Sequence, residues 1–169
     1  EPPVGTAQPQ VVSVDELLLG GRARRGVRRA VVYDDIGHYE AIAAAEALID
    51  AGAAVIFVTS CPSFAPRLNG SSRNDAALKR LQRGSFQLRV GHQLLAIGAG
   101  DCTVRPLRSE RPESLPADLV VLATHRAPQR ALYDALRGRV PALQLVGDAA
   151  SPRTLQDAIR EGHLAALQI

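Results

Sequence analysis

A turn that combines acids, a histidine and a single glycine follows the first apolar run of the chain. It reads DDIGHYE, from Asp34 to Glu40, and lies between the apolar residues 30–33 and an alanine-rich segment. In a dinucleotide-binding βαβ unit this turn carries three glycines, which allow the tight turn, the close approach of the pyrophosphate and helix packing. Here only Gly37 remains, and carboxylates repel a phosphate despite the attraction of a helix N-terminus. Nucleotide binding at Gly37 and His38 stays open, favoured by the fold context and disfavoured by the charges.

Other interpretations of this acidic pair are structural or belong to another class of protein. Asp34 and Asp35 at the start of a helix complement its dipole and cap its free N–H groups, and we rank this role ahead of a catalytic one. Two acids after a first strand are also typical of phosphorylatable receiver domains, but the sole lysine, Lys79, lies in a mid-chain helical pattern. At the end of the next strand, Thr59 and Ser60 supply no acid for the 2′-hydroxyl of NAD.

The elements that must position this turn alternate between helical and strand patterns. SVDELLLGG, in which Glu16 follows Ser13 by three residues, predicts a short capped helix. Two consecutive apolar runs joined by a helix indicate parallel strands that are covered on both faces. The further elements expected in this half are strands over 30–33 and 54–59 and helices over 39–51 and 74–83.

The rest of the chain continues the alternation after a change of pattern. Short apolar segments separated by glycines, FQLRV, QLLAIGAG and CTVRPL, predict a small antiparallel meander between residues 86 and 107. The fold class is therefore α/β, a Rossmann-like doubly wound parallel sheet with an inserted antiparallel β-meander. Beyond the meander we expect strands over 118–123 and 143–146, a helix over 129–136, and a last helix from about Pro152 to Gln168 with Ser151 as N-cap.

Composition bears on the partners of the chain. It has 169 residues, a net charge of +3 and no methionine, which indicates a piece of a longer protein. The arginine-rich cluster at 21–29 lacks interleaved aromatic residues, so we expect a linker or an inter-domain contact and no nucleic-acid binding. We expect a cytoplasmic protein without membrane contact, since no apolar run reaches the length of a span and no leader is recognisable. Cys61 and Cys102 lack metal-ligand spacing, so reduced thiols and no metal site are expected.

Two segments near the end carry a resemblance to a known family. LVVLATHRAPQRALYDAL (119–136) and LVGDAASPRTLQDAIREGHLAAL (145–167) resemble the C-terminal part of flavin-dependent oxidoreductases of the Old Yellow Enzyme-related group. That group includes trimethylamine dehydrogenase and 2,4-dienoyl-CoA reductase. The GDA segment followed by SPR, a helix and EGH is the most specific element. The ATG-type strand end at Ala123 and Thr124 is weaker, because His125 stands where glycine is usual. The resemblance spans nearly the whole chain.

The resemblance implies which residues meet a cofactor. Gly147, Asp148 and Ala149 match the GDA position, where the aspartate lies near the ribose or ribityl part of FAD or ADP. The alternative is that Asp148 only caps the helix that follows. The turn 34–40 departs from the glycine-rich turn of relatives that use NAD(P)H, and looks more like that of relatives that pass electrons to a protein acceptor. FMN and a [4Fe-4S] cluster are expected in the N-terminal part of such proteins, outside this chain.

The resemblance also implies a domain organisation and a role. We expect a linker with a short helix at 1–28, a small NAD(P)-binding-like domain at 29–140, and a return segment of an adjoining FAD/ADP-binding-like domain at 141–169. The partners are then the N-terminal flavin barrel and the host domain. The expected function is an accessory part, with no catalytic residue of its own, of an enzyme that acts on small amines or enones. A functional NAD(P)H domain that delivers hydride to a flavin and a non-enzymatic scaffold are the alternatives.

Overall fold

The computed structural model describes residues 3–20 and 26–168, so the arginine cluster predicted at 21–29 lies largely outside the described residues. Contacts within the chain divide it into two compact units, the first ending at Thr124 and the second beginning at His125. This division falls earlier than the predicted domain boundary after residue 140. Each unit is described by itself.

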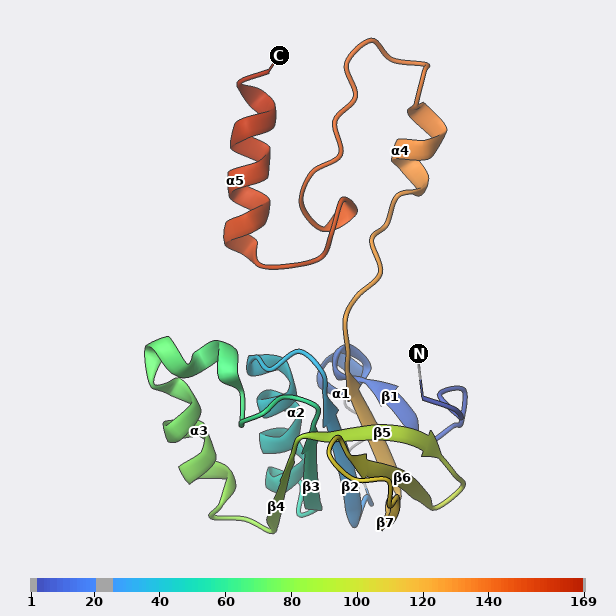
Figure 1. The fold of residues 1–169 in the computed structure, drawn as a ribbon, viewed down its shortest axis with the longest axis vertical. Helices are drawn as coiled ribbons and strands as arrows, with labels where there is room; N and C mark the ends of the chain where they lie inside the picture. The colour runs from blue at the N-terminus through green and yellow to red at the C-terminus, as the bar shows by residue number, and fades with distance from the viewer. Residues whose placement is uncertain (1–2, 21–25, 169) are drawn as a thin grey trace. The chain divides into compact units, whose positions relative to one another are not determined.

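A five-stranded parallel sheet forms the centre of the first unit, as Figure 1 shows. The strands are short and rich in valine, isoleucine and alanine, which is typical of parallel strands buried on both faces. Their order across the sheet is β1, β8, β2, β3 and β4. The bounds are β1 Val11–Ser13, β8 Leu119–Ala123, β2 Arg29–Asp34, β3 Ala54–Thr59 and β4 Phe86–Val90.

Different layers cover the two faces of this sheet. On one face lie three helices, and their buried side chains form a core with Val32, Val55 and Val121 of the strands. On the other face a three-stranded antiparallel sheet packs against Val31, Val58 and Val120. The α/β fold with a parallel sheet and a separate antiparallel sheet is thus confirmed. The helices are α1 Val14–Gly20, α2 Tyr39–Asp50 and α3 Arg73–Leu81, preceded by the 3-10 helix η2 Pro66–Ser71, and the covering strands are β5 His92–Ile97, β6 Asp101–Pro106 and β7 Glu113–Pro116.

Two sequence-based predictions for the first unit need correction. FQLRV is not part of the meander: it is β4, an edge strand that pairs in parallel with β3, with Val55 opposite Phe86. Its alternating pattern fits any half-exposed strand, so only pairing decides which sheet it joins. The third meander strand is β7 instead. Residues predicted as linker also pair, because β1 joins β8 and Val4 bridges to Ala96.

The second unit contains the helices α4 Ala131–Leu136 and α5 Leu155–Ala166 and the 3-10 turn η3 Gly147–Ala149. The strand predicted at 143–146 is absent from the described residues, since no other strand pairs with it there. The last helix begins at Leu155, three residues later than Pro152. Thr154 is its N-cap, in a capping box with Asp157. Ser151 was therefore the wrong cap, and the pattern T-x-x-D explains the later start.

Candidate functional site

The carboxyl ends of β2, β3 and β8 meet at the place where α/β sheets bind ligands. β2 is flanked by β8 on one side and β3 on the other, with Asp34 opposite both Ala123 and Thr59. The backbone continues the ladder by one residue, because Asp35 N donates to Ala123 O at 2.9 Å and Ser60 N donates to Asp34 O at 3.3 Å. The fold thus brings the acidic turn and the ATG-type strand end together.

The side chain of Asp34 is fully buried beneath this edge. Its Oδ1 accepts the backbone N–H groups of Ile36 at 3.1 Å and Gly37 at 2.9 Å. The hydroxyl of Thr59 lies 3.5 Å from the other carboxylate oxygen. Burial raises the pKa of Asp34, while these hydrogen bonds oppose the rise. Asp34 therefore belongs to the turn itself and is not displayed toward a substrate.

The carboxylate of Asp34 accepts backbone N–H groups that a bound nucleotide would need for its phosphates. In a dinucleotide fold, backbone N–H groups at the start of the first helix point at the pyrophosphate. Here the N–H groups of Ile36 and Gly37 point at a carboxylate of the same turn. A phosphate at this position would lose those donors and would face the charge of Asp34. The residues of the turn do not fit a pyrophosphate.

Gly37 is also covered by a neighbouring loop. Its φ of +73° lies in the left-handed region, and a Cβ on it would come within 2.9 Å of Pro66 Cδ and 3.1 Å of Cys61 Sγ. The N–H of Arg67 donates to Gly37 O at 3.0 Å and holds the loop there. Glycine is therefore required by close packing of the chain on itself, whereas the fingerprint uses glycine for the approach of a ligand. Sequence reasoning missed this contact, and the two prolines in CPSFAP were its only signal.

The remaining polar groups of the turn pair locally. Ser60 Oγ donates a short hydrogen bond to Asp35 Oδ1. His38 Nδ1 lies 3.0 Å from Glu40 Oε2, and both side chains are partly exposed. His38 occupies the N-cap position of α2, but its side chain makes no capping hydrogen bond. His38 is therefore a turn residue in contact with Glu40, and Asp35 is tied to the end of β3.

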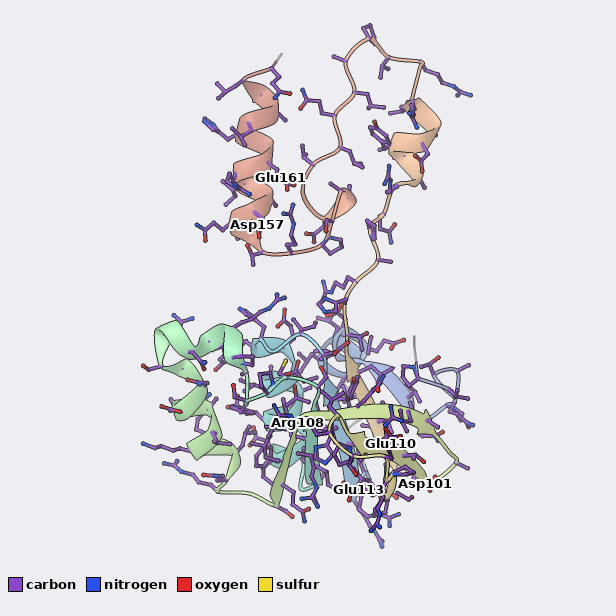
Figure 2. The ribbon with its side chains drawn as sticks, viewed as in Figure 1. Asp101, Arg108, Glu110, Glu113, Asp157 and Glu161 are labelled. Carbon is purple, nitrogen blue, oxygen red and sulfur yellow. The ribbon has the colours of Figure 1, made fainter. Side chains whose placement is uncertain are left out.

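A second glycine turn, in the other unit, carries the residues matched to the GDA position. Gly147 has a φ of +61°, and a Cβ there would lie 3.3 Å from Ala158 Cβ of α5. Its N–H donates to Glu161 Oε2 at 2.8 Å. Arg153 forms a short ion pair with the same carboxyl group. Figure 2 shows Asp157 and Glu161 on successive turns of α5.

Asp148 does not cap the helix that follows it. Thr154 and Asp157 fill the N-terminus of α5, and Asp157 N donates to Thr154 Oγ1 at 3.2 Å. The carboxylate of Asp148 is exposed. It suits hydroxyl donors such as those of a ribose, because a carboxylate only accepts hydrogen bonds. The N-terminus of α5 is a poor site for a phosphate, since the carboxylate of Asp157 already lies there and would repel it.

The other residues considered from the sequence lie in structural contacts or at exposed positions. Ala123 is buried as the last residue of β8. Thr124 closes the first unit, and His125 and His163 are exposed in the second. His92 donates from Nδ1 to Val90 O at 2.7 Å. Burial raises the pKa of the Cys102 thiol to about 12, so this cysteine is an inert core residue.

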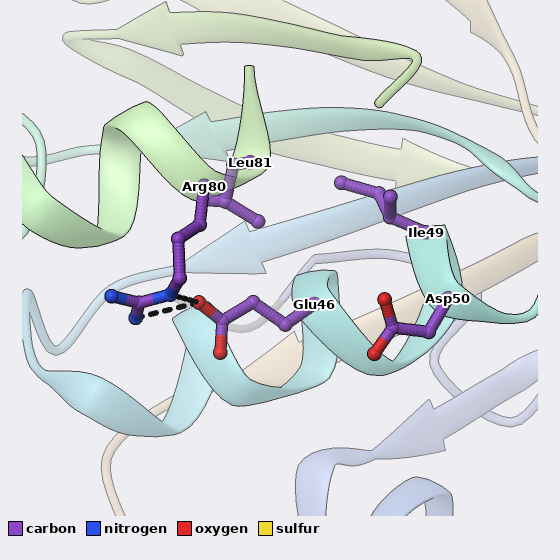
Figure 3. A pocket seen from close by; sticks show the side chains of 5 residues that line it. All are labelled: Glu46, Ile49, Asp50, Arg80 and Leu81. Carbon is purple, nitrogen blue, oxygen red and sulfur yellow. Dashed lines mark hydrogen bonds and ion pairs between the residues drawn. The ribbon is translucent and has the colours of Figure 1, made fainter. Parts of the chain in front are cut away.

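A small hollow between α2 and α3 contains charges that neutralise each other, as Figure 3 shows. Arg80 reaches across from α3 to Glu46 of α2, with an N–O distance of 2.7 Å. It also donates to the Tyr39 hydroxyl at 3.0 Å. These contacts join two helices on the outside of the sheet.

Across residues 3–20 and 26–168, no three His, Cys, Asp or Glu side chains lie close enough to hold a metal ion. Over the same residues, every helix is too short or too polar to cross a membrane.

Comparison with solved structures identifies the fold. 6-Hydroxypseudooxynicotine amine oxidase from Pseudomonas geniculata N1 matches 99% of the chain with a TM-score of 0.89 and 24% identity. Histamine dehydrogenase from Rhizobium sp. 4-9 also matches 99%, with a TM-score of 0.87 and 24% identity. A 2-naphthoyl-CoA reductase matches 100%, with a TM-score of 0.80 and 20% identity. The chain spans only 26%, 27% and 25% of those three proteins, respectively.

Sequence comparison adds one partial match. A metal reductase of Desulforamulus reducens is 44% identical over 54 residues, which is 32% of this chain and 8% of that protein. No family model matches the chain. The solved structures belong to the group of trimethylamine dehydrogenase and the Old Yellow Enzymes, so the resemblance predicted from the GDA and ATG-type segments is confirmed. The chain has the fold of a part of such oxidoreductases.

Proposed function

We propose that this chain is an accessory, dinucleotide-fold part of a larger oxidoreductase that uses FMN and an iron–sulfur cluster to act on a small amine or an enone. The observation that carries the proposal is the buried carboxylate of Asp34, which takes the N–H groups of Ile36 and Gly37. A hydride donor must hold NAD(P)H, and in this turn the N–H groups of Ile36 and Gly37, which would face its pyrophosphate, are already bonded to Asp34. The proteins of similar fold, an amine oxidase, an amine dehydrogenase and an acyl-CoA reductase, support the substrate class.

The catalytic chemistry then lies outside these residues. FMN and the [4Fe-4S] cluster belong to an N-terminal barrel, electrons leave to a protein acceptor, and the host domain adjoins the second unit. Within this chain, Asp148 is the residue that we assign to FAD or ADP, through the ribose or ribityl hydroxyls. Its exposed carboxylate and the neighbouring turn at Gly147 support that assignment. FAD or ADP would supply electron transfer or a fixed anchor, respectively, and Asp148 would only orient it.

The first test compares dinucleotides with a mononucleotide by calorimetric titration of the 169-residue chain. AMP, NADH and NADPH are titrated separately. We expect NADH and NADPH to bind no more tightly than AMP, because the second phosphate finds no free N–H group at Gly37. Binding of either dinucleotide at least tenfold tighter than AMP would contradict the proposal and restore the hydride-donor function.

The second test concerns Asp148 and uses a chain extended N-terminally through the host domain. We expect ADP or FAD to bind the extended chain and Asp148→Asn to weaken that binding, because an amide is a poorer acceptor for hydroxyl groups than a carboxylate. Asp134→Asn is the matched control, since Asp134 is an exposed acid on α4 of the same unit. Absence of ADP and FAD binding from the extended chain would favour the scaffold alternative.

A further inference from the structure

We propose that the first unit carries a separate binding site for a small aromatic anion that bears a hydroxyl or amino group. The site is a cavity of about 470 Å³ at the carboxyl ends of β3 and β4. This volume lies within the range of pockets that hold small ligands. The proposal goes beyond the accessory function and does not depend on it, because no residue of the turn 34–40 lines the cavity. Its lining residues are Ser60, Pro62, Val90, Gly91, His92, Pro106, Leu107 and Arg108.

The walls of the cavity favour an apolar, flat body. Pro62, Pro106, Val90 and Leu107 present hydrocarbon surfaces, and 39% of Val90 and 56% of Leu107 are exposed. The backbone groups of Gly91 are already used: its N–H donates to Cys61 O at 2.9 Å, and its carbonyl accepts Leu107 N–H at 2.8 Å. A ligand therefore gains contact area and few backbone hydrogen bonds from this wall. Aromatic rings obtain most binding free energy from such contacts.

Arg108 supplies the charge that selects an anion. Within residues 3–20 and 26–168, its guanidinium has no ion pair, and none joins it to Glu110 two positions further on. Figure 2 shows Arg108, Glu110 and Glu113 near the antiparallel sheet. Glu113 faces His92 instead, with an Oε1–Nε2 distance of 3.4 Å. An unpaired guanidinium beside an apolar wall suits a carboxylate or a phosphate, which it holds by two parallel hydrogen bonds.

Ser60 defines the second polar requirement. Its hydroxyl donates to Asp35 and also hydrogen-bonds with the Tyr33 hydroxyl, so it keeps no proton for a ligand and can accept only through a remaining lone pair. His92 also has its ring nitrogens directed at Val90 O and Glu113. A ligand that donates to Ser60 therefore fits better than one that only accepts. The three requirements are a flat apolar body, one anionic group and one hydroxyl or amino donor. Hydroxybenzoates and mononucleotides share this chemistry.

The experiment titrates 4-hydroxybenzoate, benzoate and AMP into the 169-residue chain and follows chemical shifts and heats. We expect saturable binding of 4-hydroxybenzoate or AMP. The probe that binds more tightly shows whether the natural ligand is a hydroxybenzoate or a mononucleotide. Arg108→Ala should weaken binding about tenfold, because a charge-assisted hydrogen bond is lost. Arg111→Ala is the matched control: Arg111 is an exposed arginine of the same segment that does not line the cavity.

Two more variants separate a built site from general charge attraction. Val90→Trp fills the cavity from a partly exposed position and should abolish binding while the circular dichroism spectrum is kept. Ser60→Ala should weaken the binding of 4-hydroxybenzoate and leave the binding of benzoate unchanged. No saturable binding of any probe to the wild-type chain, or equal losses in Arg108→Ala and Arg111→Ala, would overturn the proposal. The accessory function is tested separately, by whether NADH or NADPH binds at least tenfold more tightly than AMP.

Discussion

The turns at Gly37 and Gly147 are built on the same plan but leave different groups free. Each glycine has a positive φ, and each donates its N–H to a carboxylate of the same chain, Asp34 at 2.9 Å and Glu161 at 2.8 Å. At Gly37 the acid is fully buried and a loop covers the turn. At Gly147 the acceptor is the partly exposed Glu161. The next residue, Asp148, does not cap α5, because Thr154 and Asp157 form its capping box.

The difference indicates that two features together close the turn at Gly37 to a ligand: the buried carboxylate of Asp34 and the packing of a loop against the glycine. A buried carboxylate takes the place of the phosphate, and Pro66 and Cys61 take the space that the ligand would need. The second turn keeps an exposed carboxylate available. For that reason we propose a cofactor contact at Asp148 and assign a structural role to Asp34.

The largest expected effect comes from Gly37→Ala. A left-handed backbone costs an ordinary residue roughly 1–2 kcal/mol, and the contact with Pro66 and Cys61 adds about 1–3 kcal/mol of overpacking. Gly52→Ala is the control, because Gly52 has a φ of +89° and open space around its Cβ position. Urea unfolding should show a much larger loss for Gly37→Ala. Equal losses would mean that the loop does not close the turn.

Asp34→Ala should have the next largest effect. It leaves the buried N–H of Gly37 and the half-buried N–H of Ile36 without an acceptor, at roughly 1–3 kcal/mol for a fully buried group, partly offset by the removal of a buried charge. Asp34→Asn retains an oxygen acceptor and is the matched control. The free energies of unfolding of the two variants should therefore differ. If Asp34→Ala unfolds like wild type, the carboxylate does not organise the turn.

The charge of Asp34 also predicts a dependence of stability on pH. Burial raises its pKa in the folded chain above the ordinary 3.8, so the folded chain holds this proton more tightly than the unfolded chain. The resulting stabilisation is full below about pH 4 and is lost as the pH rises through the folded pKa. As the pH rises from about 4 through the folded pKa of Asp34, the free energy of unfolding of wild type should fall relative to that of Asp34→Asn. A constant difference between the two from pH 3 to 8 would argue against a raised pKa.

The smallest effect is expected at the second turn. Glu161→Ala removes the acceptor of Gly147 N–H and the partner of Arg153, but water reaches this site, so the loss should be about 1 kcal/mol or less. Glu161→Gln keeps an acceptor and should lie close to wild type. Thermal unfolding of both variants checks this. A loss as large as that of Asp34→Ala would remove the distinction between the two turns.

Sequence reasoning succeeded where a local pattern determines the structure. The strand at 54–59 and the helix that starts at Tyr39 follow from apolar runs and spacing. The Ser13–Glu16 cap is confirmed too, with Glu16 N donating to Ser13 Oγ at 3.2 Å. The departure of DDIGHYE from the glycine fingerprint was also visible. These features depend on residues within one or two turns of each other, so the sequence alone contains the information.

Only the tertiary structure decided what depends on partners far along the chain. The edge strand β4 and the predicted strand at 143–146 show this, because a strand exists only through pairing and short apolar runs do not name their partner. The closing of Gly37 by Pro66, and the cavity that Arg108 shares with Ser60, likewise join segments that are 29 and 48 positions apart in the sequence. Local propensity sets the elements, whereas burial and hydrogen bonding between distant segments decide which groups remain free for a ligand.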